Sequence, residues 1–95
     1  MKEFTINIPQ GVKISNLGFA TSVVEKASSY TSDDINIKLN NSQYVNAKSI
    51  LGLISLRYDA SDEITVQIIG ENENYSASNF ERFIKKLVAL YDEHN

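Results

Sequence analysis

The stretch Val45-Asn46-Ala47-Lys48-Ser49-Ile50-Leu51-Gly52-Leu53-Ile54-Ser55-Leu56 decides how this chain is interpreted. A serine followed by a short apolar run has the order of an N-cap and a helix, and it predicts a helix from Ile50 to about Leu56. Consecutive helical residues point about 100° apart, so the large apolar residues of this run cannot all face a core. We expect Leu53 on the buried side and Leu51 in an exposed apolar patch.

Alternating apolar and polar residues on both sides of this stretch predict four strands. Pro9 ends the first strand because proline cannot donate to a β-ladder. The turn-forming run 40–42 joins the second and third strands as an antiparallel hairpin. The expected strands centre on Phe4–Ile8, Ile35–Leu39, Tyr44–Val45 and Ile64–Ile68, the last ending at Gly70.

Two further segments have helical spacing. One apolar stripe starts at Leu17 and continues through Ala20, Val23, Val24, Ala27 and Tyr30, which predicts a helix over roughly 17–30. Ser78 and Glu81 have the spacing of a capping box, which predicts the start of the last helix. Behind this start lies the stripe Phe80, Phe83, Ile84, Leu87, Val88 and Tyr91. Residues 57–62 are expected to be a polar connection, and Glu71–Asn74 an acidic, asparagine-rich loop.

The predicted order is strand, helix, strand, strand, helix, strand, helix. Strands that are polar on one side predict an α+β fold, a two-layer open-faced β-sandwich with helices covering one face of an antiparallel sheet. A chain of 95 residues has room for one modest core, so residues 1–95 are expected to form a single domain.

Composition excludes several kinds of function. There is no cysteine, and His94 is the one histidine, so neither a disulfide, nor a multi-histidine metal site, nor a catalytic triad is expected. The net charge is −3 and the lysines are scattered, which argues against direct nucleic-acid binding. No long apolar span and no signal pattern at Met1-Lys2-Glu3 occur, so a cytoplasmic protein without membrane contact is expected.

The Val45–Leu56 stretch closely resembles the regulatory-serine segment of HPr, the small phosphocarrier of the bacterial sugar phosphotransferase system. The resemblance runs from the first strand into the last helix, with about three extra residues after Gly70. It implies the sheet order 1-4-2-3, with three helices on one face. It also implies a bacterial protein whose partner-docking surface includes Ile50, Leu51 and Ile54, with Thr21 added from the neighbouring helix.

The histidine that carries the phosphoryl group in HPr is missing from this chain. Ile14-Ser15-Asn16-Leu17-Gly18-Phe19-Ala20 stands where HPr has its histidine motif, with Asn16 at the histidine position, Gly18 at the arginine position and Phe19 at the proline position. An amide nitrogen conjugated to its carbonyl is not a reversible phosphoryl acceptor. Asn16 has an ordinary role available as an N-cap. We therefore expect no phosphocarrier activity, no enzymatic activity and no cofactor.

Ser49 matches the serine of HPr that a dedicated kinase and phosphorylase modify in carbon catabolite regulation. Regulatory phosphorylation of Ser49 is one interpretation, and a role limited to capping the short helix is the other. HPr-like proteins that keep the serine and lack the histidine, the Crh type, are the nearest analogy. They keep the arginine, however, whereas this chain has Gly18.

The leading hypothesis is a regulatory HPr-like protein that binds a protein partner. HPr kinase/phosphorylase or a transcriptional regulator are the partners that the resemblance implies. A phosphocarrier using another side chain, and a diverged module that forms a homodimer, are the alternatives.

Overall fold

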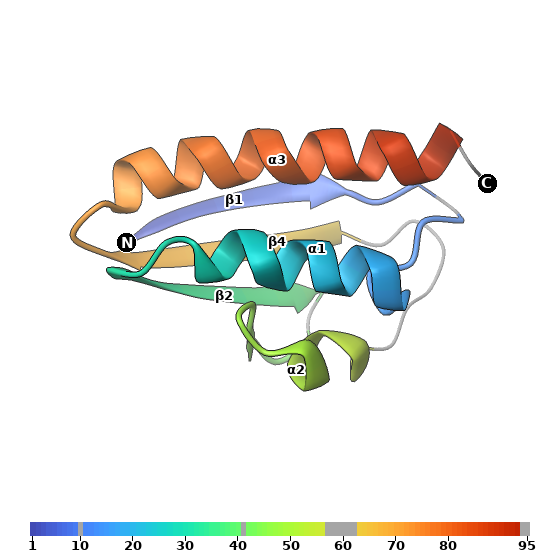
Figure 1. Cartoon of the computed structure of the whole chain (residues 1–95), viewed down its shortest axis with the longest axis horizontal. Helices are drawn as coiled ribbons and strands as arrows, with labels where there is room; N and C mark the ends of the chain where they lie inside the picture. The colour runs from blue at the N-terminus through green and yellow to red at the C-terminus, as the bar shows by residue number, and fades with distance from the viewer. Residues whose placement is uncertain (10, 41, 57–62, 94–95) are drawn as a thin grey trace.

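The computed structural model describes residues 1–9, 11–40, 42–56 and 63–93. The expected connection 57–62, the turn residue Asn41 and His94 therefore lie outside the described residues. Figure 1 labels most of the elements. In chain order they are β1 (Lys2–Asn7), α1 (Leu17–Ser28), β2 (Asp33–Leu39), β3 (Val45–Asn46), α2 (Ile50–Ile54), β4 (Glu63–Gly70) and α3 (Glu73–Glu93).

The four strands form one antiparallel sheet in the order β1-β4-β2-β3. β4 is central, because its Val66 pairs with Phe4 of β1 on one side and with Ile37 of β2 on the other. Alternate residues of β2 and β4 are buried, which is the two-residue period expected from the sequence. The element order and the strand order are both confirmed.

The helices lie on one side of this sheet, with α1 and α3 running along it and α2 beside the N-terminal half of α1 (Figure 1). The other face carries mostly polar side chains, with the exposed Ile69 of β4 as an apolar one. Cross-strand hydrogen bonds on it join Thr5 to Thr65 at 3.3 Å and Asn36 to Gln67 at 3.2 Å. This is the predicted open-faced sandwich, and its apolar core lies between the sheet and the helices.

The first helical stripe differs from the predicted one at its start. Leu17 is 66% exposed, whereas Phe19 is fully buried together with Ala20, Val23 and Ala27. Residues two positions apart on a helix lie about 200° apart, so burying Phe19 turns Leu17 outward. The predicted place of Leu17 in the buried stripe is therefore wrong, and α1 also ends two residues earlier than expected.

The predicted start of the last helix is wrong as well, because α3 begins at Glu73 and Ser78 lies within it. The first turn is fixed by Asp33, a buried residue at the start of β2. Its carboxylate accepts hydrogen bonds from the backbone N–H of Asn72 at 3.0 Å and from the Ser76 hydroxyl at 2.5 Å. A carboxylate at a helix start satisfies free N–H groups and complements the helix dipole.

Gly70 allows this close approach of β2 to the start of α3. A Cβ atom at Gly70 would lie 2.1 Å from Asp33 Oδ1 and 2.6 Å from the carbonyl oxygen of Ser32. Both distances are far below van der Waals contact. The chain can therefore pass from β4 to α3 beside Asp33 only where residue 70 has no side chain.

Tyr30 connects the end of α1 to α3 and gives the fold a dependence on pH. Its hydroxyl donates to Asn79 Oδ1 at 2.5 Å, and its ring meets Phe80 edge-on with centroids 5.7 Å apart. Burial, and to a smaller extent the nearby Tyr75, raises the pKa of Tyr30 to about 12. Because this pKa is higher than the pKa of about 10 in the unfolded chain, the neutral phenol stabilises the folded state. The contribution is complete below about pH 10 and is lost as pH rises toward 12.

We predict that Tyr30→Phe lowers the free energy of unfolding by about 1 kcal/mol near neutral pH, through the lost hydrogen bond. The variant should also show a weaker fall of stability between about pH 10 and 12 than the wild type. Urea melts across this range measure both effects, with the exposed Tyr75→Phe as a control that changes neutral-pH stability little. Identical pH profiles for Tyr30→Phe and wild type would contradict the assignment.

Candidate functional site

Asn16 is the N-cap of α1. Its Oδ1 accepts a hydrogen bond from the backbone N–H of Phe19 at 3.1 Å, and its own carbonyl accepts from Ala20 at 2.9 Å. The side chain therefore satisfies one of the free N–H groups at the helix start. The geometry shows that Asn16 caps α1, as its N-cap role in the sequence predicts.

Tyr91 of α3 covers the start of α1 next to Asn16. Its ring packs edge-on against Phe19, with centroids 5.3 Å apart and planes at 79°. A Cβ atom at Gly18 would lie 2.6 Å from Tyr91 Oη and 3.8 Å from Tyr91 Cζ. A side chain at position 18 therefore requires the tyrosine hydroxyl to move, and this contact was not predicted from the sequence.

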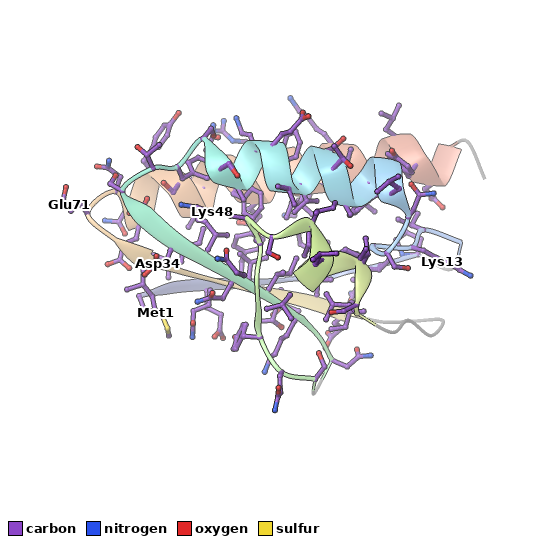
Figure 2. All side chains as sticks on the ribbon, turned by 60° about the horizontal axis from the view of Figure 1, so that its bottom comes forward. Met1, Lys13, Asp34, Lys48 and Glu71 are labelled. Carbon is purple, nitrogen blue, oxygen red and sulfur yellow. The ribbon has the colours of Figure 1, made fainter. Side chains whose placement is uncertain are left out.

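A cleft of about 310 Å³ lies between Tyr91 and the loop before α1. Gly11, Lys13, Ser15 and Asn16 also line it. Lys13 lies at the end of the molecule opposite Glu71 (Figure 2), so this cleft is remote from the Asp33 cap of α3. The sequence motif points to the start of α1 alone, and nothing in its spacing places Tyr91 beside it.

Ser49 is the N-cap of α2. Its Oγ accepts from the backbone N–H of Gly52 at 3.1 Å, and the residue is partly exposed. A Cβ atom at Gly52 would lie 3.3 Å from Val45 Cβ, so this glycine lets α2 pack closely on β3. α2 ends at Ile54, two residues before the expected end, and Leu56 beyond it is still buried.

Lys48, the residue before this cap, points into the protein. Its ammonium donates to the carbonyl oxygens of Tyr30 at 2.8 Å and Asp33 at 2.7 Å. Figure 2 labels Lys48 where the segment before α2 meets α1 and β2. These two charge-assisted bonds hold the Ser49 segment against the loop that follows α1.

An exposed apolar surface lies on α1 and α2, which contact each other. Leu51 is 72% exposed and Ile54 40%, while Leu53 on the opposite side of α2 is fully buried. Ile50 is half-buried, and Thr21 is exposed on α1. Leu17 lies four residues before Thr21, and therefore on the same side of α1, and it is also exposed rather than part of the core. We call Leu17, Thr21, Ile50, Leu51 and Ile54 the α1/α2 patch.

Within the described ranges, no three His, Cys, Asp or Glu side chains lie close enough together to hold a metal ion. In the same part of the chain, no helix is both long enough and apolar enough to cross a membrane.

The fold is an open-faced β-sandwich, with three helices on one face of a four-stranded antiparallel sheet whose strands lie in the order 1-4-2-3. A sequence model described as the PTS HPr component phosphorylation site matches residues 1–86. The chain therefore belongs to the HPr family.

Solved structures share this fold. HPr-C-His from Thermoanaerobacter tengcongensis is 27% identical, with 94% of this chain and 97% of that chain covered and a TM-score of 0.77. The histidine-containing phosphocarrier protein of Mycoplasma is 23% identical over 92% and 97% of the two chains, with a TM-score of 0.76. Bacillus subtilis Crh, described as a swapped dimer, is 24% identical over 92% and 94%, with a TM-score of 0.63. A search of curated proteins gave no match.

The two leucines of α2 provide a direct test of the α1/α2 patch. Leu51→Glu should change the free energy of unfolding by no more than about 0.5 kcal/mol, because the side chain is exposed. Leu53→Ala should lower it by about 2–5 kcal/mol through lost burial and a cavity. Urea melts of both variants compare the two positions, and equal destabilisation would mean that Leu51 belongs to the core.

Proposed function

We propose that this protein is a cytoplasmic, regulatory member of the HPr family that binds another protein through the α1/α2 patch. It does not carry a phosphoryl group on histidine. The observation that carries the proposal is the exposure of Leu51, which projects from α2 two residues after the Ser49 cap. Large apolar side chains gathered at one exposed place, with polar residues beside them, are typical of an interaction surface.

The loss of carrier activity is supported by the start of α1. The Asn16 side chain caps the helix, and an amide nitrogen cannot accept and release a phosphoryl group as an imidazole does. Gly18 stands at the position of the family's arginine. A Cβ atom there would lie only 2.6 Å from the Tyr91 hydroxyl. Both changes remove groups that phosphotransfer needs.

Phosphorylation of Ser49 is the proposed means of regulation. Ser49 is partly exposed at the start of α2, and Lys48 holds the segment in place from the inside. Three anionic oxygens next to Leu51 would change the charge of the docking surface without removing its apolar side chains. An HPr kinase/phosphorylase would then be one partner, and a transcriptional regulator that recognises the modified surface would be another.

A phosphotransfer assay tests the loss of carrier activity. Incubation with phosphoenolpyruvate and enzyme I should leave the protein unmodified, because no described side chain at the start of α1 is an imidazole. Intact-mass spectrometry measures the outcome, with an ordinary HPr as the positive control. A stoichiometric, acid-labile phosphoryl group would contradict the proposal.

A gain-of-function series extends this assay. Asn16→His with Gly18→Arg should recover little transfer, whereas adding Tyr91→Phe should recover more. The third change removes the oxygen at 2.6 Å and leaves the nearest ring carbon at 3.8 Å, an ordinary contact. Equal activity of the double and triple variants would show that Tyr91 is not the obstacle.

Kinase labelling tests the regulatory site. Treatment with ATP and an HPr kinase should place one phosphate on Ser49, and Ser49→Ala should abolish it. The far-ultraviolet circular dichroism should change little, because a phosphate at a helix start complements the helix dipole. Peptide mass spectrometry locates the phosphate, with Ser55→Ala, at the C-cap of the same helix, as a matched control. Failure of several such kinases to label the wild type would leave Ser49 as a cap only.

A pull-down comparison separates partner binding from self-association. If the patch binds a different protein, Leu51→Glu should abolish capture of that protein and leave the sedimentation coefficient unchanged. A concentration-dependent dimer that Leu51→Glu dissociates would instead support the self-associating alternative.

A further inference from the structure

Two adjoining clefts lie between α1 and α3, on the side of α1 that faces α3 rather than α2. One has a volume of about 290 Å³ and the other about 370 Å³, and Lys26 and Phe83 line both. We call them together the α1/α3 cleft. Its two ends carry different chemical groups, and the proposed function uses neither of them.

The first end is basic. Lys26 of α1 faces Arg82 and Lys86 of α3, which are four residues apart and so lie on one side of their helix. Within the described part of the chain, none of these three cations has a carboxylate partner within 4.0 Å. Lys85, by contrast, is paired with Glu81 at 3.3 Å outside the cleft. Three cations without carboxylate partners stand together on a chain whose net charge is −3.

An amide adds a neutral donor to this end. Asn79 Oδ1 accepts a hydrogen bond from the Tyr30 hydroxyl. The NH₂ group of Asn79 therefore remains to donate into the cleft. Guanidinium, ammonium and amide N–H groups together match the acceptor oxygens of a phosphate.

Phe83 provides the apolar lining shared by both ends. One face of its ring stacks on Phe80, with centroids 6.4 Å apart and planes at 6°. Lys26 Nζ lies 5.7 Å from the centroid of the same ring. Phe80 and the Lys26 ammonium thus position the ring, and the half-buried Phe83 side chain gives the cleft an apolar lining against which a sugar can pack.

The second end carries hydroxyls and a carboxylate. Ser22, Glu25 and Ser29 line it from α1. Ser29 donates its hydroxyl hydrogen to the Lys26 carbonyl at 2.6 Å, so its oxygen is left to accept. A carboxylate and hydroxyl oxygens suit the hydroxyl groups of a sugar and would repel a second phosphate.

We propose that the α1/α3 cleft binds a sugar phosphate, either a free monosaccharide phosphate or the ribose phosphate of a nucleotide. The phosphate lies among Lys26, Arg82 and Lys86, the ring packs on Phe83, and the sugar hydroxyls donate to Glu25. Binding here leaves Ser49 and the α1/α2 patch exposed, so this inference does not depend on the proposed function.

Titrations of the ¹⁵N-labelled full chain test the proposal, with glucose 6-phosphate, AMP, inorganic phosphate and glucose as probes. Glucose 6-phosphate or AMP should cause saturable shifts of backbone amides in 22–29 and 79–86. If glucose 6-phosphate binds more tightly, the ligand is a free monosaccharide phosphate, and if AMP binds more tightly, it is a nucleotide. Inorganic phosphate should bind at least about tenfold more weakly, and glucose alone should not bind.

Matched variants distinguish the cleft from general electrostatic attraction. Arg82→Gln should weaken binding of the phosphorylated probe about tenfold, because it removes a charge-assisted contact. Lys85→Gln, the same change of charge one turn away, should leave affinity within about twofold. Glu25→Gln should reduce the preference for the sugar phosphate over inorganic phosphate.

Three results would overturn the proposal. The first is the absence of saturable shifts at about 10 mM of either phosphorylated probe, which would largely fill a site with a Kd of about 1 mM. The second is inorganic phosphate binding as tightly as the sugar phosphates. The third is an equal effect of Lys85→Gln and Arg82→Gln. All of these substitutions are at exposed or partly exposed positions, so circular dichroism should confirm that each variant folds.

Discussion

The carboxylate of Asp33 is the interaction on which the rest of the structure depends. A buried carboxylate is costly unless its oxygens accept hydrogen bonds, and here both do, from Asn72 N–H and the Ser76 hydroxyl. The carbonyl oxygen of the same residue accepts from Lys48. One residue therefore joins the start of β2, the first turn of α3 and the segment before α2. Losing the carboxylate would leave the α3 start and the Ser76 hydroxyl without their partner.

This arrangement also orients the Ser49 segment. Lys48 is held by backbone carbonyl groups of residues that follow α1, so Ser49 and α2 are attached to the end of α1 as well as to β3. The exposed position of Leu51 then follows from Leu53, because burial of one leucine on a helix of five residues turns the other outward. A phosphate on Ser49 would add charge at the edge of a surface whose orientation is fixed from beneath.

The sequence predicts the parts of this fold that depend on neighbours in the chain. Strand alternation, the Asn16 and Ser49 caps and the contrast between Leu51 and Leu53 all arise from local spacing, and the structure shows each. The strand order came from the family resemblance, since periodicity does not specify which strands pair. The start of α3 was misplaced because its cap comes from Asp33, about forty residues earlier, while Ser78 and Glu81 have capping spacing inside the helix. Leu17 was misassigned because Phe19, matched to a proline, was not counted in the core.

The contact between Tyr91 and Gly18 shows how a distant cap affects the site at the start of α1. Ser76, Phe80, Ile84, Leu87 and Tyr91 follow one another at intervals of three or four residues, so they form one continuous side of α3. Ser76 at one end of this row is bonded to Asp33, and Tyr91 at the other end packs on Phe19. The helix rises about 1.5 Å per residue, so fixing its first turn also fixes where Tyr91 meets α1. The glycine at position 18 and the tyrosine at position 91 are therefore parts of one packing arrangement, and a side chain at position 18 requires the Tyr91 hydroxyl to move.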